Sequence, residues 1–419
     1  MKVLEFGGYL GLGGTEKATC RWSIGLKQRG HEVSVLAMRM GPRARELEEA
    51  GIPVLLCPWD RTAVAQTLAS HRPDVIHLHA PGVPAEVDVI GEALLTLPRI
   101  PVVQTNIFGH LENPREDAWT DFRLFISWTS CVQAARRSFL KLDREFFRKA
   151  SVAVYPLDPE DAPPAEKIRC FREGLGIGPQ EVLFGRLSRP EPNKWTELPL
   201  DAFRRALKKT PQIKLLLREP PPLVAQQLRN APDADRFVIL PATSDPAELR
   251  LTLASLDAVL HTSSIGESFG YGIAEPMNLG KPVVTNSVPW GDQAQIELVR
   301  HGECGFIAST PASMAEAVLK LAADPGLRKQ FGEQAVAHIH KIADVEISLD
   351  RLEKALYAVV EGRENPLWEE DLKRARAAAD DLDQQQFGHG WREQFALRPF
   401  YYRVRFNQWR RVAKARIFS

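Results

Sequence analysis

The sequence predicts an α/β protein with two Rossmann-like domains that face each other across a cleft, followed by a C-terminal helical tail. Its 419 residues are too many for one compact core and suit two domains of ordinary size. Short apolar strands alternate with helix-like segments in two successive series, which indicates parallel sheets covered by helices on both faces. A proline-rich stretch, residues 156–164, separates the two series.

The first series begins with a strand, a glycine turn and a helix. VLEF (residues 3–6) precedes GGYLGLGG, after which Ala18, Trp22 and Leu26 recur every four residues, as on one face of a helix. Gly30 then ends the helix and EVSVLA begins the next strand, which completes a βαβ unit. Further strands are predicted within PVLLC, DVIHLH, PVVQT and LFIS.

The second series predicts a second sheet. Its strands lie within EVLFGRLS, IKLLLRE, RFVILPA, DAVLHT and KPVVTN, and helical patterns separate them. We therefore expect one domain over residues 1–157, a second over residues 165–345, and C-terminal helices with a basic-aromatic tail over residues 346–419. The last region opens with the helical pattern SLDRLEKALYAVVEG.

The composition excludes several classes of protein. Lys and Arg number 54 against 53 Asp and Glu, so the formal net charge of +1 gives no global field for nucleic acid. The start, MKVLEFGG, breaks on glycines and is expected to be a strand, and no apolar run approaches the roughly 18 to 20 residues of a membrane-spanning helix. The cysteines are odd in number and scattered, which favours a reducing, cytoplasmic compartment: Cys20, Cys57, Cys131, Cys170 and Cys304.

A glycine loop, GLGGTE (residues 11–16), follows the first strand. Gly13 and Gly14 permit close approach of the backbone, and the next helix offers free N–H groups at its N-terminus, so a phosphate or a sugar could bind here. A tight turn without a ligand is the alternative. Dinucleotide binding is disfavoured, because Glu16 stands where a third glycine is needed and the second strand ends on Arg39 instead of an acid.

Two basic residues follow the first strand of the second series. Arg186 lies in FGRL, and Lys194 precedes the next helical pattern. A guanidinium fork and an ammonium together can neutralise a diphosphate through charge-assisted hydrogen bonds. Solvated surface cations are the alternative interpretation.

The strongest motif is HTSSIGESFGYGIAEPMNLGKPVVT, which begins at His261. It places Glu267 in a glycine loop and Glu275 about two turns into the following helix. In a sugar-transfer site, one of these carboxylates could lie near the reacting sugar and the other near a diol. A helix cap and an exposed helical charge are the ordinary alternative.

The three motifs together resemble the family-4 glycosyltransferases of the GT-B fold, whose signature is an E-x(7)-E pair. PWGDQAQIELVRHGECGFIA continues the resemblance, and PDVIHLHAP with FISWTSCVQA is similar to the N-terminal domain of that family. The resemblance covers about residues 1–360 and is strongest from 181 to 310. It implies retention of anomeric configuration, an acceptor-side first domain and a second domain that binds a nucleotide sugar.

The resemblance also implies roles for single residues. Glu267, Arg186 and Lys194 form the catalytic set, in which Glu267 contacts the donor sugar and the two cations cradle the diphosphate. Glu275 would hold the ribose hydroxyls. The remaining donor-binding residues are expected in the two glycine loops: Ser268, Phe269, Gly270, Gly13 and Gly14.

Acceptor or sugar contacts are expected at strand ends of the first domain. His79 ends DVIHLH, and Asn106 and His110 follow PVVQT. Thr15 and Glu16 of the glycine loop complete this set. Histidines at such places are more often structural or solvent-exposed, which is the alternative interpretation for His79 and His110. The loop QTNIFGH also departs from the many family members that place a His or Asp directly after this strand.

No metal site is expected. Asp233 and Asp235 have the letters of an Asp-x-Asp motif, but they precede a strand and so lie at the wrong sheet edge for a ligand. Arg186, Lys194 and helix N-termini supply the positive field that Mg²⁺ supplies in other transferases.

The end of the chain interleaves arginines with aromatic residues in RPFYYRVRFNQWRRVAKARIF, residues 398–418. Such a segment is typical of helices at anionic membrane surfaces. A helix folded back on the first domain, with buried aromatics and snorkelling arginines, is an equal alternative. In the membrane case, deleting residues 396–419 should release the protein from vesicles and leave transfer to a soluble acceptor intact.

We therefore expect an enzyme that moves a hexose from a nucleoside diphosphate sugar to a hydroxyl of a glycan or glycolipid, in the synthesis of a surface polysaccharide or glycolipid. The nucleotide sugar is a co-substrate, and no cofactor is expected. The expected place is the cytoplasm, at the inner face of the membrane if the tail binds lipid. The alternatives are an epimerase or hydrolase of sugar nucleotides on the same fold, and a non-catalytic carbohydrate-binding protein.

Overall fold

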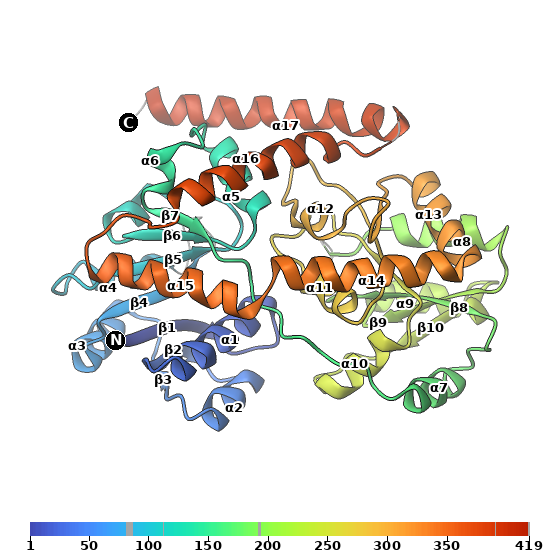
Figure 1. The fold of residues 1–419 in the computed structure, drawn as a ribbon, viewed down its shortest axis with the longest axis horizontal. Coiled ribbons are helices and arrows are strands. Elements are labelled where there is room, and N and C mark those ends of the chain that lie inside the picture. Colours follow the sequence, from blue (N-terminus) through green and yellow to red (C-terminus); the bar gives the residue numbers. More distant parts are fainter. Residues whose placement is uncertain (81–86, 112, 192–193, 390, 418–419) are drawn as a thin grey trace. The chain divides into compact units, whose positions relative to one another are not determined.

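The computed structural model describes residues 1–80, 87–111, 113–191, 194–389 and 391–417 (Figure 1). The chain forms two compact units. The first comprises Met1–Pro156 and Ala343–Asp380, and the second comprises Leu157–Ile342 and Asp381–Ser419. Each unit is built around one parallel sheet, which confirms the prediction of two α/β domains.

Within the described residues, the first sheet has seven parallel strands in the order β3-β2-β1-β4-β5-β6-β7. The strand order changes direction between β1 and β4, and open sheets bind ligands outside the carboxyl ends of the strands at such a switch point. The strands are β1 (Lys2–Tyr9), β2 (Glu32–Arg39), β3 (Val54–Leu56), β4 (Val75–Ala80), β5 (Val102–Asn106), β6 (Phe122–Phe125) and β7 (Ala150–Val152).

Helices cover both faces of this sheet. On one face, Leu4 and Leu78 pack with Leu68 of the third helix. On the other face, Trp22 of the first helix lies against the ring of His77, with 5.4 Å between the ring centroids. The helical segments of this unit are α1 (Gly14–Gln28), α2 (Pro42–Glu49), α3 (Arg61–His71), α4 (Val87–Leu94), η1 (Pro114–Ala118), α5 (Trp128–Arg137), α6 (Arg144–Phe147) and α15 (Val345–Val360).

Helix α15 belongs to the first unit although it follows the second sheet in the sequence. The indole N–H of Trp22 donates a hydrogen bond to Ser348 (2.9 Å), and a Cβ atom at Gly25 would collide with Leu349. The prediction of one separate region over residues 346–419 is therefore corrected. The region divides near residue 380, because the buried side of α15 completes the core of the first unit.

Within the described residues, the second sheet has six parallel strands in the order β10-β9-β8-β11-β12-β13, the order of a Rossmann fold. Its switch point lies between β8 and β11. The strands are β8 (Val182–Leu187), β9 (Ile213–Arg218), β10 (Phe237–Leu240), β11 (Ala258–His261), β12 (Val283–Thr285) and β13 (Gly305–Ile307).

Helices also pack on this second sheet. Phe184 and Leu260 of the strands share a core with Phe203 and Met314 of helices α8 and α13. The helical segments between Ala165 and Ile342 are α7 (Ala165–Gly174), α8 (Leu198–Leu207), α9 (Pro222–Arg229), η2 (Ala234–Arg236), α10 (Pro246–Ala254), α11 (Tyr271–Asn278), α12 (Ala294–Leu298), α13 (Pro311–Ala323) and α14 (Pro325–Ile342).

The end of the chain groups with the second unit. Helix α16 (Trp368–Gln385) passes from the first unit to the second, and α17 (Trp391–Ile417) is the long helix next to the C-terminus in Figure 1. The alternative in which the tail folds back had placed it on the first domain. The described contacts correct this placement, because Gln386, Glu393 and Phe400 contact loops of the second sheet.

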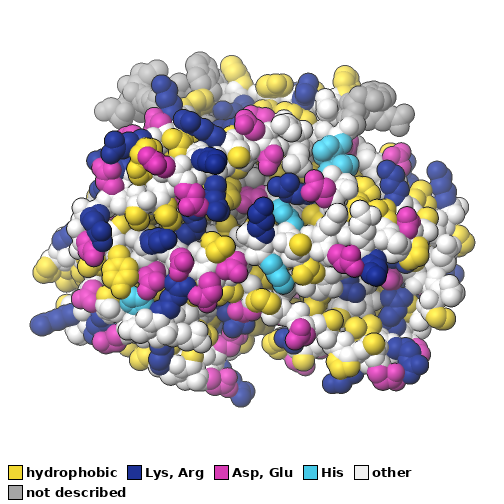
Figure 2. Space-filling view, in the orientation of Figure 1, with side chains coloured by type: hydrophobic (Ala, Val, Ile, Leu, Met, Phe, Trp, Pro, Cys, Tyr) yellow, Lys and Arg dark blue, Asp and Glu magenta, His cyan; other side chains and the backbone are white. Residues whose placement is uncertain are grey.

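Three further observations bear on compartment and surface. All five cysteines are free thiols. In the part of the chain that the structure describes, no helix combines the length and apolar character needed to cross a bilayer. Figure 2 shows basic and acidic side chains interspersed over the visible face, as the net charge of +1 suggests.

Candidate functional site

The candidate donor site lies at the switch point of the second sheet. Arg186 is near the carboxyl end of β8 and His261 ends β11, and these strands are neighbours. The loop 262–270 then leads into α11. The motifs predicted for donor binding therefore meet where an open parallel sheet is expected to bind its ligand.

Arg186 is almost completely buried, with 1% of its surface exposed. Its guanidinium donates to the side-chain and backbone oxygens of Thr262 (2.8 and 3.1 Å) and to the backbone oxygen of Lys194 (2.6 Å), and it lies 4.4 Å from the centre of the Trp195 ring. Burial lowers the pKa of Arg186 to about 10, so the group is still a cation at neutral pH. Its Nε–H has no hydrogen-bond partner among the described residues.

The Glu267 carboxylate joins Lys194 and His261 into one cluster. Its Oε1 accepts hydrogen bonds from the Lys194 ammonium (2.8 Å) and from Nε2 of His261 (3.0 Å). Burial alone would raise the pKa of Glu267, but the hydrogen bonds and charges of His261 and Lys194 lower it to about 2. Glu267 is therefore ionised at neutral pH and can accept a hydrogen bond from a hydroxyl.

The loop that carries Glu267 requires glycine at one position. Gly266 has a φ of +78°, and a Cβ atom there would collide with the backbone oxygen of Asp292. The next residue is held from both sides: the Glu267 N–H donates to Oε1 of Gln295 (2.9 Å), and its carbonyl accepts from the Ala294 N–H (2.8 Å). The carboxylate is thus placed by the first residues of α12 as well as by its own loop.

Helix α11 begins directly after this loop. Gly270 is its N-cap, with a φ of +99°, and Phe269 is buried beneath it. Ser268 and Glu275 are half-buried, and Glu275 lies in the second half of the eight-residue helix. The structure therefore brings the predicted donor residues 267–270 to a helix N-terminus, where free N–H groups and the helix dipole favour an anion.

The glycine loop of the first unit forms the N-terminus of α1. Gly13 is the N-cap, and a Cβ atom there would collide with the carboxylate of Glu16, which folds back over it. Gly14 is the first residue of the helix, and Thr15 is hydrogen-bonded to the buried hydroxyl of Tyr155. These four predicted residues lie together at the carboxyl end of β1.

His79 and Asn106 lie at the ends of β4 and β5, but their side chains have different hydrogen-bond partners. His79 is joined through Nδ1 to Tyr155 (3.1 Å), its Nε2 has no hydrogen-bond partner in the described chain, and burial lowers its pKa well below the ordinary value. The buried Asn106 side chain closes its own loop, because it donates to the His110 carbonyl (2.5 Å) and accepts from the His110 N–H (3.2 Å). Asn106 therefore supports the loop, whereas His79 is linked to the glycine loop through Tyr155.

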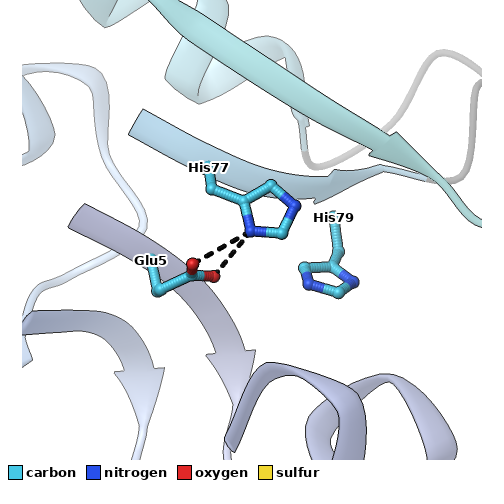
Figure 3. Close-up of side chains that lie close together, drawn as sticks. All are labelled: Glu5, His77 and His79. Atoms are coloured by element: carbon cyan, nitrogen blue, oxygen red, sulfur yellow. Dashed lines mark hydrogen bonds and ion pairs between the residues drawn. The ribbon is translucent and has the colours of Figure 1, made fainter. Parts of the chain in front are cut away.

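His77, whose ring lies beside that of His79, belongs to a buried polar network of the first sheet (Figure 3). Nδ1 of His77 lies 2.8 and 3.0 Å from the carboxylate oxygens of Glu5, and its Nε2 lies 2.7 Å from the Thr105 hydroxyl. Glu5, His77 and Thr105 are all fully buried. Both ring nitrogens of His77 are thus satisfied inside the core, as buried polar groups require.

Two groups of residues bear on the prediction that no metal binds. Asp233 lies before β10 and pairs with Arg204 (3.0 Å). Among the described residues, Glu5, His77 and His79 offer three ligand atoms within 4.8 Å of one another, which is the chemistry of a transition-metal site. A cation there would have to replace the hydrogen bond between Glu5 and His77 in the middle of a packed core.

Sequence reasoning missed several residues of these networks: Glu5, His77, Tyr155, His261 and Gln295. Glu5 and His77 do leave a signal, since each is a polar residue in the centre of an otherwise apolar strand. His261 lies inside the strongest motif without an obvious role. Gln295 leaves no signal, because its partner Glu267 is reached only through the fold of a loop.

The pair between Glu5 and His77 should contribute measurably to stability. Glu5→Ala removes the acceptor and leaves a buried imidazole N–H without a partner, so the free energy of unfolding should fall by about 3 kcal/mol or more. Glu5→Gln keeps an acceptor oxygen and should lose only about 1 kcal/mol. Denaturant unfolding measures both, and equal losses for the two variants would contradict a stabilising role of the hydrogen bond.

Family models match both sheet domains. The model described as glycosyl transferases group 1 matches residues 178–324, and the model described as glycosyl transferase 4-like domain matches residues 13–163. No curated protein matches the sequence.

Solved structures are similar over most of the chain. HepE of Anabaena, in complex with UDP, is 20% identical, covers 85% of this chain with 100% of its own, and has a TM-score of 0.70; its complex with UDP-glucose is also similar. A glycosyltransferase of Rickettsia africae is 15% identical over 86% of this chain and 98% of its own, with a TM-score of 0.71. WaaG, a glycosyltransferase of lipopolysaccharide biosynthesis, is 14% identical over 86% and 98%, with a TM-score of 0.58. These likenesses confirm the GT-B fold that the sequence predicts.

Proposed function

Because this chain is a glycosyltransferase of the family-4 type, we propose that it transfers a hexose, with retention of configuration, from a nucleoside diphosphate sugar to an acceptor hydroxyl. The cluster of Arg186, Lys194 and Glu267 at the switch point of the second sheet carries the proposal. It combines two cations with an ionised carboxylate beside a helix N-terminus, which suits a diphosphate joined to a sugar. The UDP and UDP-glucose complexes of the similar HepE support this class of donor.

The donor roles follow from charge. The guanidinium of Arg186 stays positively charged although it is buried, and its Nε–H is available to donate a hydrogen bond. It can therefore stabilise the leaving diphosphate with little reorganisation. Lys194 bridges this cation and Glu267, and a diphosphate oxygen would compete with Glu267 for its ammonium. Glu267 would then accept a sugar hydroxyl, and Glu275 on α11 would hold the ribose.

The acceptor side is assigned to the first sheet. Glu16 places a carboxylate beside the N-terminus of α1, where its charge stabilises the helix through the helix dipole and disfavours binding of a phosphate at the same place. Hydroxyl groups of a sugar remain suitable partners for Thr15, Glu16 and the neutral His79. The acceptor is proposed to be a glycan or glycolipid in surface polysaccharide or glycolipid synthesis, and the likeness to WaaG supports that class.

The two glutamates should fail differently when each is changed to Gln. Glu275→Gln weakens the hold on a ribose diol and should raise KM for the donor, whereas Glu267→Gln should lower kcat by about 100-fold or more. Initial rates with UDP-, GDP- and ADP-sugars measure both variants, and proton NMR of the product reads its anomeric configuration. Matching kinetic profiles, or full activity in either variant, would refute the assigned roles.

Donor binding separates this proposal from a carbohydrate-binding protein. A nucleoside diphosphate at about 100 times its dissociation constant should stabilise the protein by about 2.7 kcal/mol, which thermal unfolding detects. Arg186→Met should abolish the shift. Nucleotide-dependent release of a free sugar without any acceptor product would favour the hydrolase alternative instead.

Transfer should not need a divalent cation. Arg186, Lys194 and the N-terminus of α11 supply positive charge at the proposed diphosphate site. Rates measured after EDTA treatment should therefore match untreated enzyme. Loss of turnover that only Mg²⁺ or Mn²⁺ restores would disprove this, and metal analysis of Glu5→Gln would test whether the Glu5 cluster holds the ion.

We also propose that α17 brings the enzyme to an anionic membrane. Phe395, Tyr402 and Phe406 are spaced by seven and four residues, so they share one face of the helix, and they are 78%, 63% and 58% exposed. Exposed arginines, Arg398 and Arg403, lie on the two sides of this aromatic stripe. Aromatic residues flanked by cations suit the interface of anionic lipids.

The aromatic stripe should control vesicle binding. Changing Phe395, Tyr402 and Phe406 together to Ser should release the protein from vesicles of phosphatidylglycerol and phosphatidylcholine in a sedimentation assay. Wild-type protein should bind these vesicles less as salt is raised, since the attraction is partly electrostatic. Equal sedimentation of wild type and triple variant would contradict membrane contact through this face.

A further inference from the structure

We propose that residues 386–389 and 391–400, here called the tail latch, are a positioning element for Glu267. It acts through residues 287–293, here called the support loop, which lie between the tail latch and the Glu267 loop. The inference rests on the proposed function of Glu267, but every contact that carries it lies within the second unit.

The tail latch touches the support loop at both ends. The Ser287 hydroxyl donates to the backbone oxygen of Gln386 (2.6 Å). The ring of Phe400 packs edge-on against Trp290, with 4.5 Å between the centroids. Two opposite faces of α17 therefore differ in their surroundings. Leu397 and Phe400 are turned toward the second sheet domain, and the aromatic stripe of Phe395, Tyr402 and Phe406 lies on the other side of the helix.

A buried carboxylate fastens the middle of the tail latch. Glu393, 3% exposed, accepts hydrogen bonds from the backbone N–H of Ser309 (2.6 Å) and from the Ser313 hydroxyl (2.6 Å). It therefore sits at the N-terminus of α13, where the helix dipole favours a negative charge. The Ser309 hydroxyl in turn accepts from the Ser287 N–H (2.9 Å), so this contact also leads to the support loop.

A pair of imidazoles adds to the attachment. His389 of the tail latch stacks on His301 with 3.7 Å between the ring centroids. Burial and the neighbouring His389 lower the pKa of His301 to about 4, and burial lowers that of His389. Both rings are therefore neutral at neutral pH, and they stack without repulsion.

The support loop carries the constraint to Glu267 through two buried glutamines. Gln293 accepts from the Val288 N–H (3.0 Å) and from the side chain of Gln295 (3.3 Å). Gln295 in turn accepts from the Glu267 N–H (2.9 Å). The bonds to Gln293 join buried groups and the bond to the Glu267 N–H is partly buried, so breaking any of them exposes or strands a polar group at a cost.

The consequence concerns catalysis more than folding. A displacement of about 1 Å in a catalytic group can reduce a rate about 100-fold. The support loop touches the Glu267 loop directly, because the Asp292 N–H donates to the Ile265 carbonyl (3.0 Å) and a Cβ atom at Gly266 would collide with the Asp292 backbone, so the support loop helps to fix the Glu267 loop. Under this proposal loss of Phe400 impairs transfer, which is the opposite of the sequence-based expectation that deleting residues 396–419 leaves the chemistry intact.

The test compares Phe400→Ala with Asn407→Ala, a change on an exposed position of the same helix. With a soluble acceptor, Phe400→Ala should lower kcat between about 10-fold and 100-fold with little change in KM for the donor, and Asn407→Ala should match wild type. Trp290→Ala should reproduce the loss, and the double variant should add nothing, because both remove one contact.

A second comparison tests whether the effect passes through Glu267. In a Glu267→Gln background, Phe400→Ala should cause no further loss of kcat. Unchanged kcat in Phe400→Ala, or a full loss added to that of Glu267→Gln, would overturn the proposal.

Hydrogen exchange keeps this test apart from the proposed function. Amides of residues 263–270 should exchange faster in Phe400→Ala than in Asn407→Ala, while the amides of β8 and β9 stay protected. This readout needs no substrate, so a wild type without transferase activity would refute the proposed function alone. Unchanged exchange at 263–270 would refute the tail latch alone.

Discussion

The largely buried carboxylate of Glu267 is the charge on which the rest of the proposed donor site depends. Burial would favour its neutral form, and Lys194 and His261 keep it ionised. Arg186 donates a hydrogen bond to the backbone oxygen of Lys194 and so fixes that residue. A second hydrogen bond, from Arg186 to the Thr262 hydroxyl, offsets the cost of burying the guanidinium. One network therefore joins β8, β11 and the loop between β11 and α11, so a change at any member alters the surroundings of the others.

The sequence predicts well what is local. The βαβ start, the two series of strands and the glycine loop before Glu267 each follow from spacing within about 25 residues, and the structure contains them. The short strands β7 and β13, of three residues each, lack a pattern long enough to detect. Contacts between distant residues are likewise hidden: Glu5 meets His77, and α1 meets α15, only because the sheet order brings them together.

The tail shows why composition alone left its alternatives open. Aromatic residues on α17 lie on two opposite faces, so the helix has no single apolar side that a periodic pattern would reveal. Leu397 is buried and the half-exposed Phe400 packs on Trp290, whereas Phe395, Tyr402 and Phe406 are more exposed. The packing on the second sheet domain and the proposed membrane contact therefore use different faces of the same helix. The fold-back face contacts the second sheet domain because Glu393 finds its partners at the N-terminus of α13.

The two sheets share a strand order and differ in charge. At the switch point of the second sheet, Arg186 and Lys194 outnumber one carboxylate, whereas at that of the first sheet the Glu16 carboxylate lies at the N-terminus of α1. The charges at the second sheet attract a negatively charged diphosphate, and the charge of Glu16 at the first sheet repels it. A neutral sugar hydroxyl is not repelled and can use the Glu16 carboxylate as an acceptor. In the proposed function, the same topology therefore serves a donor in one domain and an acceptor in the other, and the distinction comes from a few side chains at each switch point.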